Sequence, residues 1–178
     1  MTFPVFSTGE VLRAADMNAV GLWLVKTQTV GTGVSSVTVT GAFSADYDNY
    51  QILFSGGSKS VAGTMNLQLG ATGVGYYNTW YGRDYLNNPV QNAASNATTT
   101  SVGVEGTTNG MDAIWFINSP FLTTRTTYRG VTNSIQAGGY SYNFGGFVDN
   151  ATSYTAFTLF VQTGTLTGGT IRVYGYRN

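Results

Sequence analysis

Most of this chain alternates between apolar and polar residues with a period of two, and this alternation restricts it to an all-β fold. The pattern begins at Thr27 and is clearest at Met65, Leu67 and Leu69, which fall on one face of an extended segment. Clusters of Gly, Asn and Ser separate the alternating runs, and the polar stretch 89–100 predicts an exposed loop. The expected strands are 34–40, 49–54, 62–69, 76–81, 99–105, 111–117, 124–132, 139–147, 155–162 and 169–176. The sequence therefore predicts an antiparallel β-sandwich of the jelly-roll kind.

The first 26 residues break this pattern and predict a helix. Ser7 and Glu10 have the spacing of a capping box at a helix start, although Gly21 weakens the helical pattern. One amphipathic helix cannot bury its own apolar face, so it must pack against a partner or against the domain that follows it. We therefore expect a docking segment at residues 1–26 and a β domain at residues 27–178. The apolar docking residues are Phe6, Val11, Leu12, Met17, Val20, Leu22, Trp23 and Leu24.

Composition excludes several classes of chemistry. The 178 residues include no His and no Cys, so a His-ligated zinc, a Cys nucleophile, a Ser-His-Asp triad and a disulfide are all excluded. Eight Lys and Arg balance eight Asp and Glu, which gives no basic surplus for binding nucleic acid. No apolar run approaches the ~20 residues that a membrane span requires. A neutral chain is suited to an assembly, in which partners cover much of its surface.

Catalysis would have to use paired carboxylates, as in glycoside hydrolysis. The acids of the β domain that could serve are scattered along the chain, and no two of them can be paired from sequence. They are Asp84, Glu105, Asp112 and Asp149. The sequence therefore predicts no enzymatic activity, no metal and no cofactor.

An aromatic run between residues 76 and 85 is the main candidate for a binding site. Flat rings stack on the apolar faces of sugars, and neighbouring polar side chains can hydrogen-bond the hydroxyl groups. The candidate residues are Tyr76, Tyr77, Trp80, Tyr81, Arg83, Asp84 and Tyr85. The alternative is that half of these rings fill the core and the others line a contact between subunits. A second set, Tyr140, Tyr142, Phe144 and Phe147, alternates in its strand, which places Tyr140, Tyr142 and Phe144 together on one face, where packing is expected.

Three phrases of the sequence resemble bacteriophage proteins. The opening phrase, Phe6 to Asn18 with Gly9-Glu10-Val11-Leu12 and Ala14-Ala15-Asp16-Met17-Asn18, resembles the N-terminal segment of many minor tail and fibre-like proteins. Arg13 stands where the related sequences usually have Thr. Residues 43–50, FSADYDNY, resemble the opening of a β domain that is common in phage tail proteins, and residues 167–177 resemble its closing strand.

The resemblance implies a virion structural protein that is assembled in the host cytoplasm. Its expected role is that of a tail appendage or tail-tip component, with residues 1–26 docked on the particle and the β domain in contact with host-surface saccharides. The expected partners are other copies of the chain in a homotrimer, other virion proteins and host saccharide, but neither nucleic acid nor a membrane. The alternatives are a capsid decoration or head-fibre protein, and a free-standing carbohydrate-binding module. Residues 60–165 match no phrase and are where a host-specific surface is expected.

Overall fold

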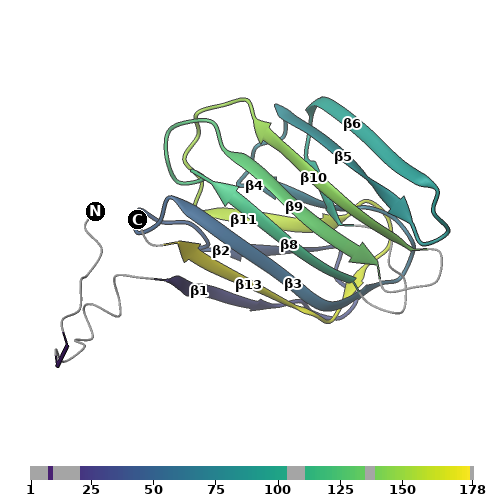
Figure 1. Ribbon diagram of the computed structural model, residues 1–178, viewed down its shortest axis with the longest axis horizontal. Coiled ribbons are helices and arrows are strands. Elements are labelled where there is room, and N and C mark those ends of the chain that lie inside the picture. The colour runs from purple at the N-terminus through teal and green to yellow at the C-terminus, as the bar shows by residue number, and fades with distance from the viewer. Residues whose placement is uncertain (1–7, 10–20, 104–110, 135–138, 177–178) are drawn as a thin grey trace.

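The computed structural model describes residues 8–9, 21–103, 111–134 and 139–176. In these ranges the chain forms antiparallel strands that are arranged in two sheets (Figure 1). The all-β class expected from the period-two alternation is therefore confirmed. Across the same ranges, no helix has the length and apolar character needed to cross a membrane.

The larger sheet has nine strands. They are β1 (Leu22–Thr29), β3 (Asn49–Lys59), β5 (Tyr76–Asp84), β6 (Pro89–Ala97), β8 (Met111–Asn118), β9 (Thr127–Ser134), β10 (Tyr140–Val148), β12 (Leu166–Thr167) and β13 (Thr170–Tyr176). Their order is β1-β13-β3-β8-β9-β10-β5-β6, and β12 pairs with the end of β3. β1 and β6 therefore form the two edges of the sheet, on opposite sides of the molecule (Figure 1).

The smaller sheet has four strands, in the order β2-β11-β4-β7. They are β2 (Ser36–Thr40), β4 (Met65–Leu69), β7 (Thr100–Gly103) and β11 (Ala156–Val161). Alternate residues of β11 are buried, and they share one apolar core with alternate residues of β3, β8 and β13. The core is therefore enclosed between the two sheets, as in a sandwich.

Aromatic side chains of the large sheet form hydrogen bonds with backbone groups of the small sheet across this core. The indole Nε1 of Trp115 in β8 donates to the carbonyl oxygen of Val102 in β7 at 2.9 Å. The backbone N–H of Leu69 in β4 donates to the hydroxyl of Tyr76 in β5 at 2.7 Å. Each large aromatic ring thus fills the core and also satisfies a backbone group of the opposite sheet.

The two phrases in the β domain that resemble phage proteins pack against each other. Within 43–50, the backbone N–H of Ser44 donates to the hydroxyl of Tyr50 at 2.8 Å, which holds the turn before β3. The ring of Tyr47 covers Gly175 in the closing strand so closely that a Cβ added there would lie 2.3 Å from the ring. The residues that carry the resemblance therefore form part of the framework.

The expected N-terminal helix is wrong over Leu22–Lys26, because these residues form the first part of β1. Leu22 pairs with Tyr176 and Leu24 with Tyr174 of β13, so the strand lies across the expected boundary between residues 26 and 27. A short apolar run fits either a helix or a strand, and pairing with β13 decides in favour of the strand. The remaining docking residues, Phe6, Val11, Leu12, Met17 and Val20, lie outside the described part of the chain.

The loop expected at 89–100 is also wrong, since most of it forms strand β6. Pro89 is the first residue of this strand, a position at which a missing N–H is tolerated. β6 pairs only with β5, and none of its residues is buried. An edge strand exposed to this extent carries the polar composition of a loop, which is why composition misled the assignment.

Candidate functional site

Strand β5 divides the aromatic run between the two faces of the large sheet. Successive strand residues point to opposite faces. Tyr76, Asn78 and Trp80 face inward, where Tyr76 is completely buried and Trp80 is half-buried. Tyr77 and Tyr81 face outward, and Tyr81 is 67% exposed. The seven candidate residues therefore do not form one surface.

The remaining three candidates are Arg83 and Asp84, which end β5, and Tyr85, which begins the turn to β6. The carboxylate of Asp84 accepts hydrogen bonds from the backbone N–H and the side-chain Nδ2 of Asn88, each at 2.7 Å. These bonds hold the pKa of Asp84 below its ordinary value. Arg83 donates to the backbone oxygen of Asn87 at 2.7 Å, and Tyr85 is exposed beside them. Arg83 and Asp84 thus shape the turn.

The outer face of the large sheet brings together side chains from four strands. Tyr77 of β5 stacks on Phe147 of β10, with ring centroids 5.0 Å apart and planes 5° apart. Arg129 of β9 lies over the ring of Phe116 of β8, with its guanidinium carbon 5.5 Å from the ring centroid. Tyr81 pairs in register with Asn143 of β10, in the next outward-facing row after that of Arg129 and Phe116. We call these residues the outer platform: Tyr77, Tyr81, Phe116, Arg129, Asn143 and Phe147.

Two hollows lie on the outer platform. The first has a volume of about 530 Å³ and is lined by Tyr77, Phe147 and Gly145 among others. The second, of about 390 Å³, lies between Tyr81 and Arg129. Gly145 leaves the first hollow open, and a Cβ added there would meet no atom closer than 3.5 Å. Tyr77 lines the first hollow and Tyr81 the second, and the two residues are four apart on one strand, so their Cα atoms are separated by ~13 Å.

Sequence reasoning identified only part of the outer platform. Phe116, Arg129 and Asn143 are separated along the chain, and only the register of β8, β9 and β10 brings them together. The packing predicted for the second aromatic set is confirmed for Tyr142 and Phe144, each 4% exposed. Phe147 is three residues after Phe144, so its side chain points to the other side of β10 and lies on the outer face.

A third hollow lies on the other side of β5 and β6, and we call it the inner pocket. Its volume is about 330 Å³, and its lining includes Asn66 of β4, Asn78 and Trp80 of β5, Asn92 of β6 and Ser101 of β7. The Nδ2 of Asn66 and the Oδ1 of Asn78 are buried and have no hydrogen-bond partner. This pocket is absent from the sequence prediction, because its residues come from strands that are distant in sequence.

Behind the inner pocket lies the buried hydroxyl of Tyr128. Burial raises the pKa of Tyr128 to about 12, against the opposing effect of hydrogen bonds with the side chains of Thr100 and Asn78. The hydroxyl donates to the backbone oxygen of Tyr77 at 3.2 Å. The Oδ1 of Asn78 has no hydrogen-bond partner.

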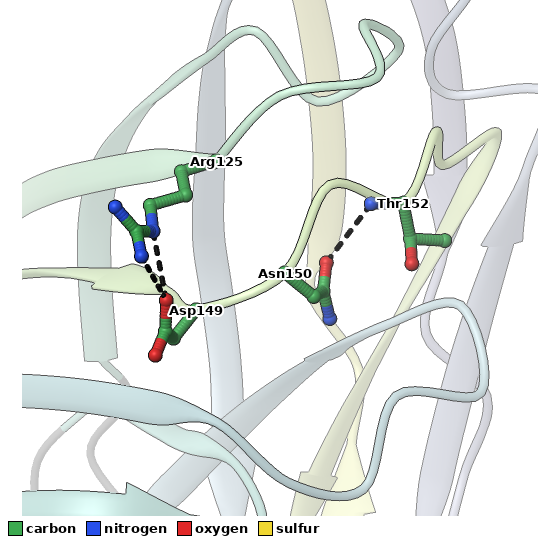
Figure 2. A network of polar contacts seen from close by, with 4 residues as sticks. All are labelled: Arg125, Asp149, Asn150 and Thr152. Carbon is green, nitrogen blue, oxygen red and sulfur yellow. Dashed lines mark hydrogen bonds and ion pairs between the residues drawn. The ribbon is translucent and has the colours of Figure 1, made fainter.

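The structure does not bring the candidate acids together. Asp149 forms an ion pair with Arg125, with 2.6 Å between Oδ1 and Nη2 (Figure 2). Asp112 accepts a hydrogen bond from the backbone N–H of Gly56, and Asp84 organises its own turn. Glu105 lies outside the described residues. Among the residues that the structure describes, no three acidic side chains are grouped so as to hold a metal ion.

Asn150, which directly follows Asp149, has a structural role. The Oδ1 of Asn150 accepts a hydrogen bond from the backbone N–H of Thr152 at 3.1 Å (Figure 2). It also accepts one from the hydroxyl of Tyr154 at 2.9 Å. Asn150 therefore holds the loop that leads into β11.

Comparison with models of known protein families found no match, and a search of curated proteins found no similar sequence.

Proposed function

We propose that this chain is a bacteriophage virion structural protein, a tail appendage or tail-tip component, that binds host-surface saccharide without chemistry. The observation that carries the binding part is the outer platform, where exposed rings lie beside hydrogen-bonding side chains around two hollows. Flat rings suit the apolar faces of sugars. Arg129 and Asn143 supply donors and an acceptor for hydroxyl groups.

The virion part rests on the three phrases that resemble phage proteins. Two of them form the packing unit of Tyr47 and Gly175, so the likeness concerns the β framework that presents the platform. Leu22 and Leu24, two of the expected docking residues, are 42% and 56% exposed on the open edge strand β1. In the proposal, this edge and residues 1–20 attach the domain to the particle and to its own copies as a homotrimer. Several copies then multiply weak saccharide contacts.

A hollow-filling substitution tests the binding part. Gly145→Leu puts a side chain into the first hollow, at a position where the backbone has room for a Cβ. The matched control is Gly73→Leu, because Gly73 also has room for a Cβ but lies in the β4–β5 loop, away from the platform. We expect Gly145→Leu to weaken glycan binding roughly tenfold or more, which corresponds to the ~1.4 kcal/mol of lost contact that a filled site removes. Gly73→Leu should bind as the parent chain does.

The readout is binding of the purified protein to an array of bacterial surface glycans, together with adsorption of intact particles to cells. Equal loss in both variants, or no glycan binding by the parent chain, would contradict the binding part of the proposal.

Immunogold labelling of virions tests the location. Label at the distal end of the tail supports the appendage, whereas label over the head favours a capsid decoration protein. The absence of label from particles would leave a free carbohydrate-binding module.

A further inference from the structure

We propose that the inner pocket binds a single neutral sugar residue, at a site separate from the outer platform. The pocket lies on the inward side of β5 and β6, next to β4 and β7. Its volume of about 330 Å³ is near the lower end of the range for small-molecule sites, which suits one ring better than a chain.

The lining of the pocket selects an uncharged, hydroxyl-rich ligand. Four of the lining side chains are carboxamides and four are hydroxyls, and the described residues that line it carry no charge. A charged ligand would lose its hydration there without meeting a counter-ion, which is costly. A ligand with many hydroxyl groups can instead donate to the carboxamide oxygens and accept from the amide nitrogens and hydroxyls.

Two buried atoms point to a ligand rather than to a packing role. Asn66 is 3% exposed and its Nδ2 donor has no acceptor, and Asn78 is 5% exposed and its Oδ1 acceptor has no donor. Buried polar groups of folded proteins almost always have partners, so these two are exceptions that need an explanation. One donor and one acceptor match the two capacities of hydroxyl groups on a sugar ring.

Trp80 supplies the apolar wall of the pocket. It is half-buried against the core, and its position opposite Asn92 in β6 places it among the amides. An indole face covers the C–H face of a pyranose ring, while the amides address its edge. The same residue was expected to contact glycan as part of a single aromatic surface, but the structure assigns it to this second site.

The inner pocket is a separate site from the outer platform, although Asn78 and Ala94 line both the inner pocket and the first hollow of the platform. The inner pocket lies on the other face of β5 and uses a different aromatic side chain. It would bind a single sugar residue, whereas the platform would bind an extended oligosaccharide. The two proposals can therefore fail separately.

The test is an NMR titration of the labelled full chain with neutral monosaccharides at millimolar concentrations. The signals followed are the side-chain amides of Asn66 and Asn78, the indole N–H of Trp80, and, for the platform, the side-chain amide of Asn143. We expect saturable shifts of the first three signals with at least one neutral hexose or N-acetylhexosamine. Signals of the platform should move with longer oligosaccharides.

Two variants separate binding from folding. Asn66→Leu removes the unpartnered donor with little change in size, so we expect at least a tenfold loss of affinity and an unchanged or higher urea midpoint. Thr98→Trp places a large side chain at the exposed turn that lines the pocket, and it should also abolish the shifts. The matched control is Thr123→Trp, on an exposed loop outside the lining, which should bind as the parent chain does.

Shifts at the pocket that both variants abolish would support the inference. Shifts confined to Asn143 would overturn it and leave the platform proposal intact, whereas pocket shifts without platform shifts would do the reverse. No shift at the pocket with any neutral sugar would overturn it, as would an Asn66→Leu variant that is destabilised and still binds.

Discussion

Tyr76 and Tyr77 are neighbours in the chain, yet β5 places their hydroxyl groups in opposite environments. The hydroxyl of Tyr76 accepts the backbone N–H of Leu69 inside the core, while Tyr77 lies on the outer face. We expect Tyr76→Phe to lower the free energy of unfolding by about 1–3 kcal/mol, because the N–H of Leu69 loses its buried acceptor. Tyr77→Phe should change it by no more than about 0.5 kcal/mol. Urea denaturation of the two variants measures the difference, and equal values would contradict the assigned role of Tyr76.

The buried tyrosines also make stability depend on alkaline pH. Burial raises the pKa of Tyr128 to about 12 and also raises those of Tyr50 and Tyr76. The folded chain then holds these protons more tightly than the unfolded chain, whose tyrosines ionise near pH ~10. Their contribution to stability is complete below that pH and decreases as pH rises toward the folded-state values. Urea unfolding at a series of pH values should give a free energy that decreases above pH ~10; a flat profile would refute this.

At the scale of elements, β1 should contribute to stability as a full member of the large sheet. Trp23 and Val25 are half-buried, and the strand pairs with β13 along its length. The free energy of unfolding should therefore be lower, by about 2 kcal/mol or more, for a chain that begins at Val30 than for one that begins at Gly21. The reason is that a buried large apolar side chain is worth about 1.5–3 kcal/mol. Denaturation of both truncated chains makes the comparison. Equal midpoints would show that β1 adds nothing.

Some of the strands could be predicted from the sequence, and others could not. Strands such as β9 and β11 were predicted, and burial alternates from residue to residue along them. β1 and β6 were missed because an edge strand has little buried alternation to reveal it. The outer platform and the inner pocket depend on cross-strand register, which composition and spacing along one strand cannot supply. The inward position of Tyr76 could be predicted from the alternation of side chains along β5. Its hydrogen bond with Leu69 could be found only from the three-dimensional fold.

At the scale of the whole molecule, charge balance predicts how the protein associates. Eight basic and eight acidic residues give a formal charge of zero near neutral pH, and the sequence pI is about 6.1. Like-charge repulsion between molecules is therefore weakest close to the pI. There, exposed apolar side chains of β1 and of the platform can contact those of another molecule. We expect static light scattering to show the strongest attraction between molecules near the pI and weaker attraction on either side. Attraction that is independent of pH would exclude charge as the control.

The β5–β6 hairpin makes the protein a natural scaffold for displaying foreign peptides. Its turn is held by the Asp84 and Asn88 contacts and lies at the edge farthest from β1 (Figure 1). Since β6 buries none of its residues, an epitope inserted after Leu86 would extend into solvent without disturbing the core. In the proposed assembly on a particle, each copy would present that epitope at the same height and orientation, which is the geometry an immunogen needs.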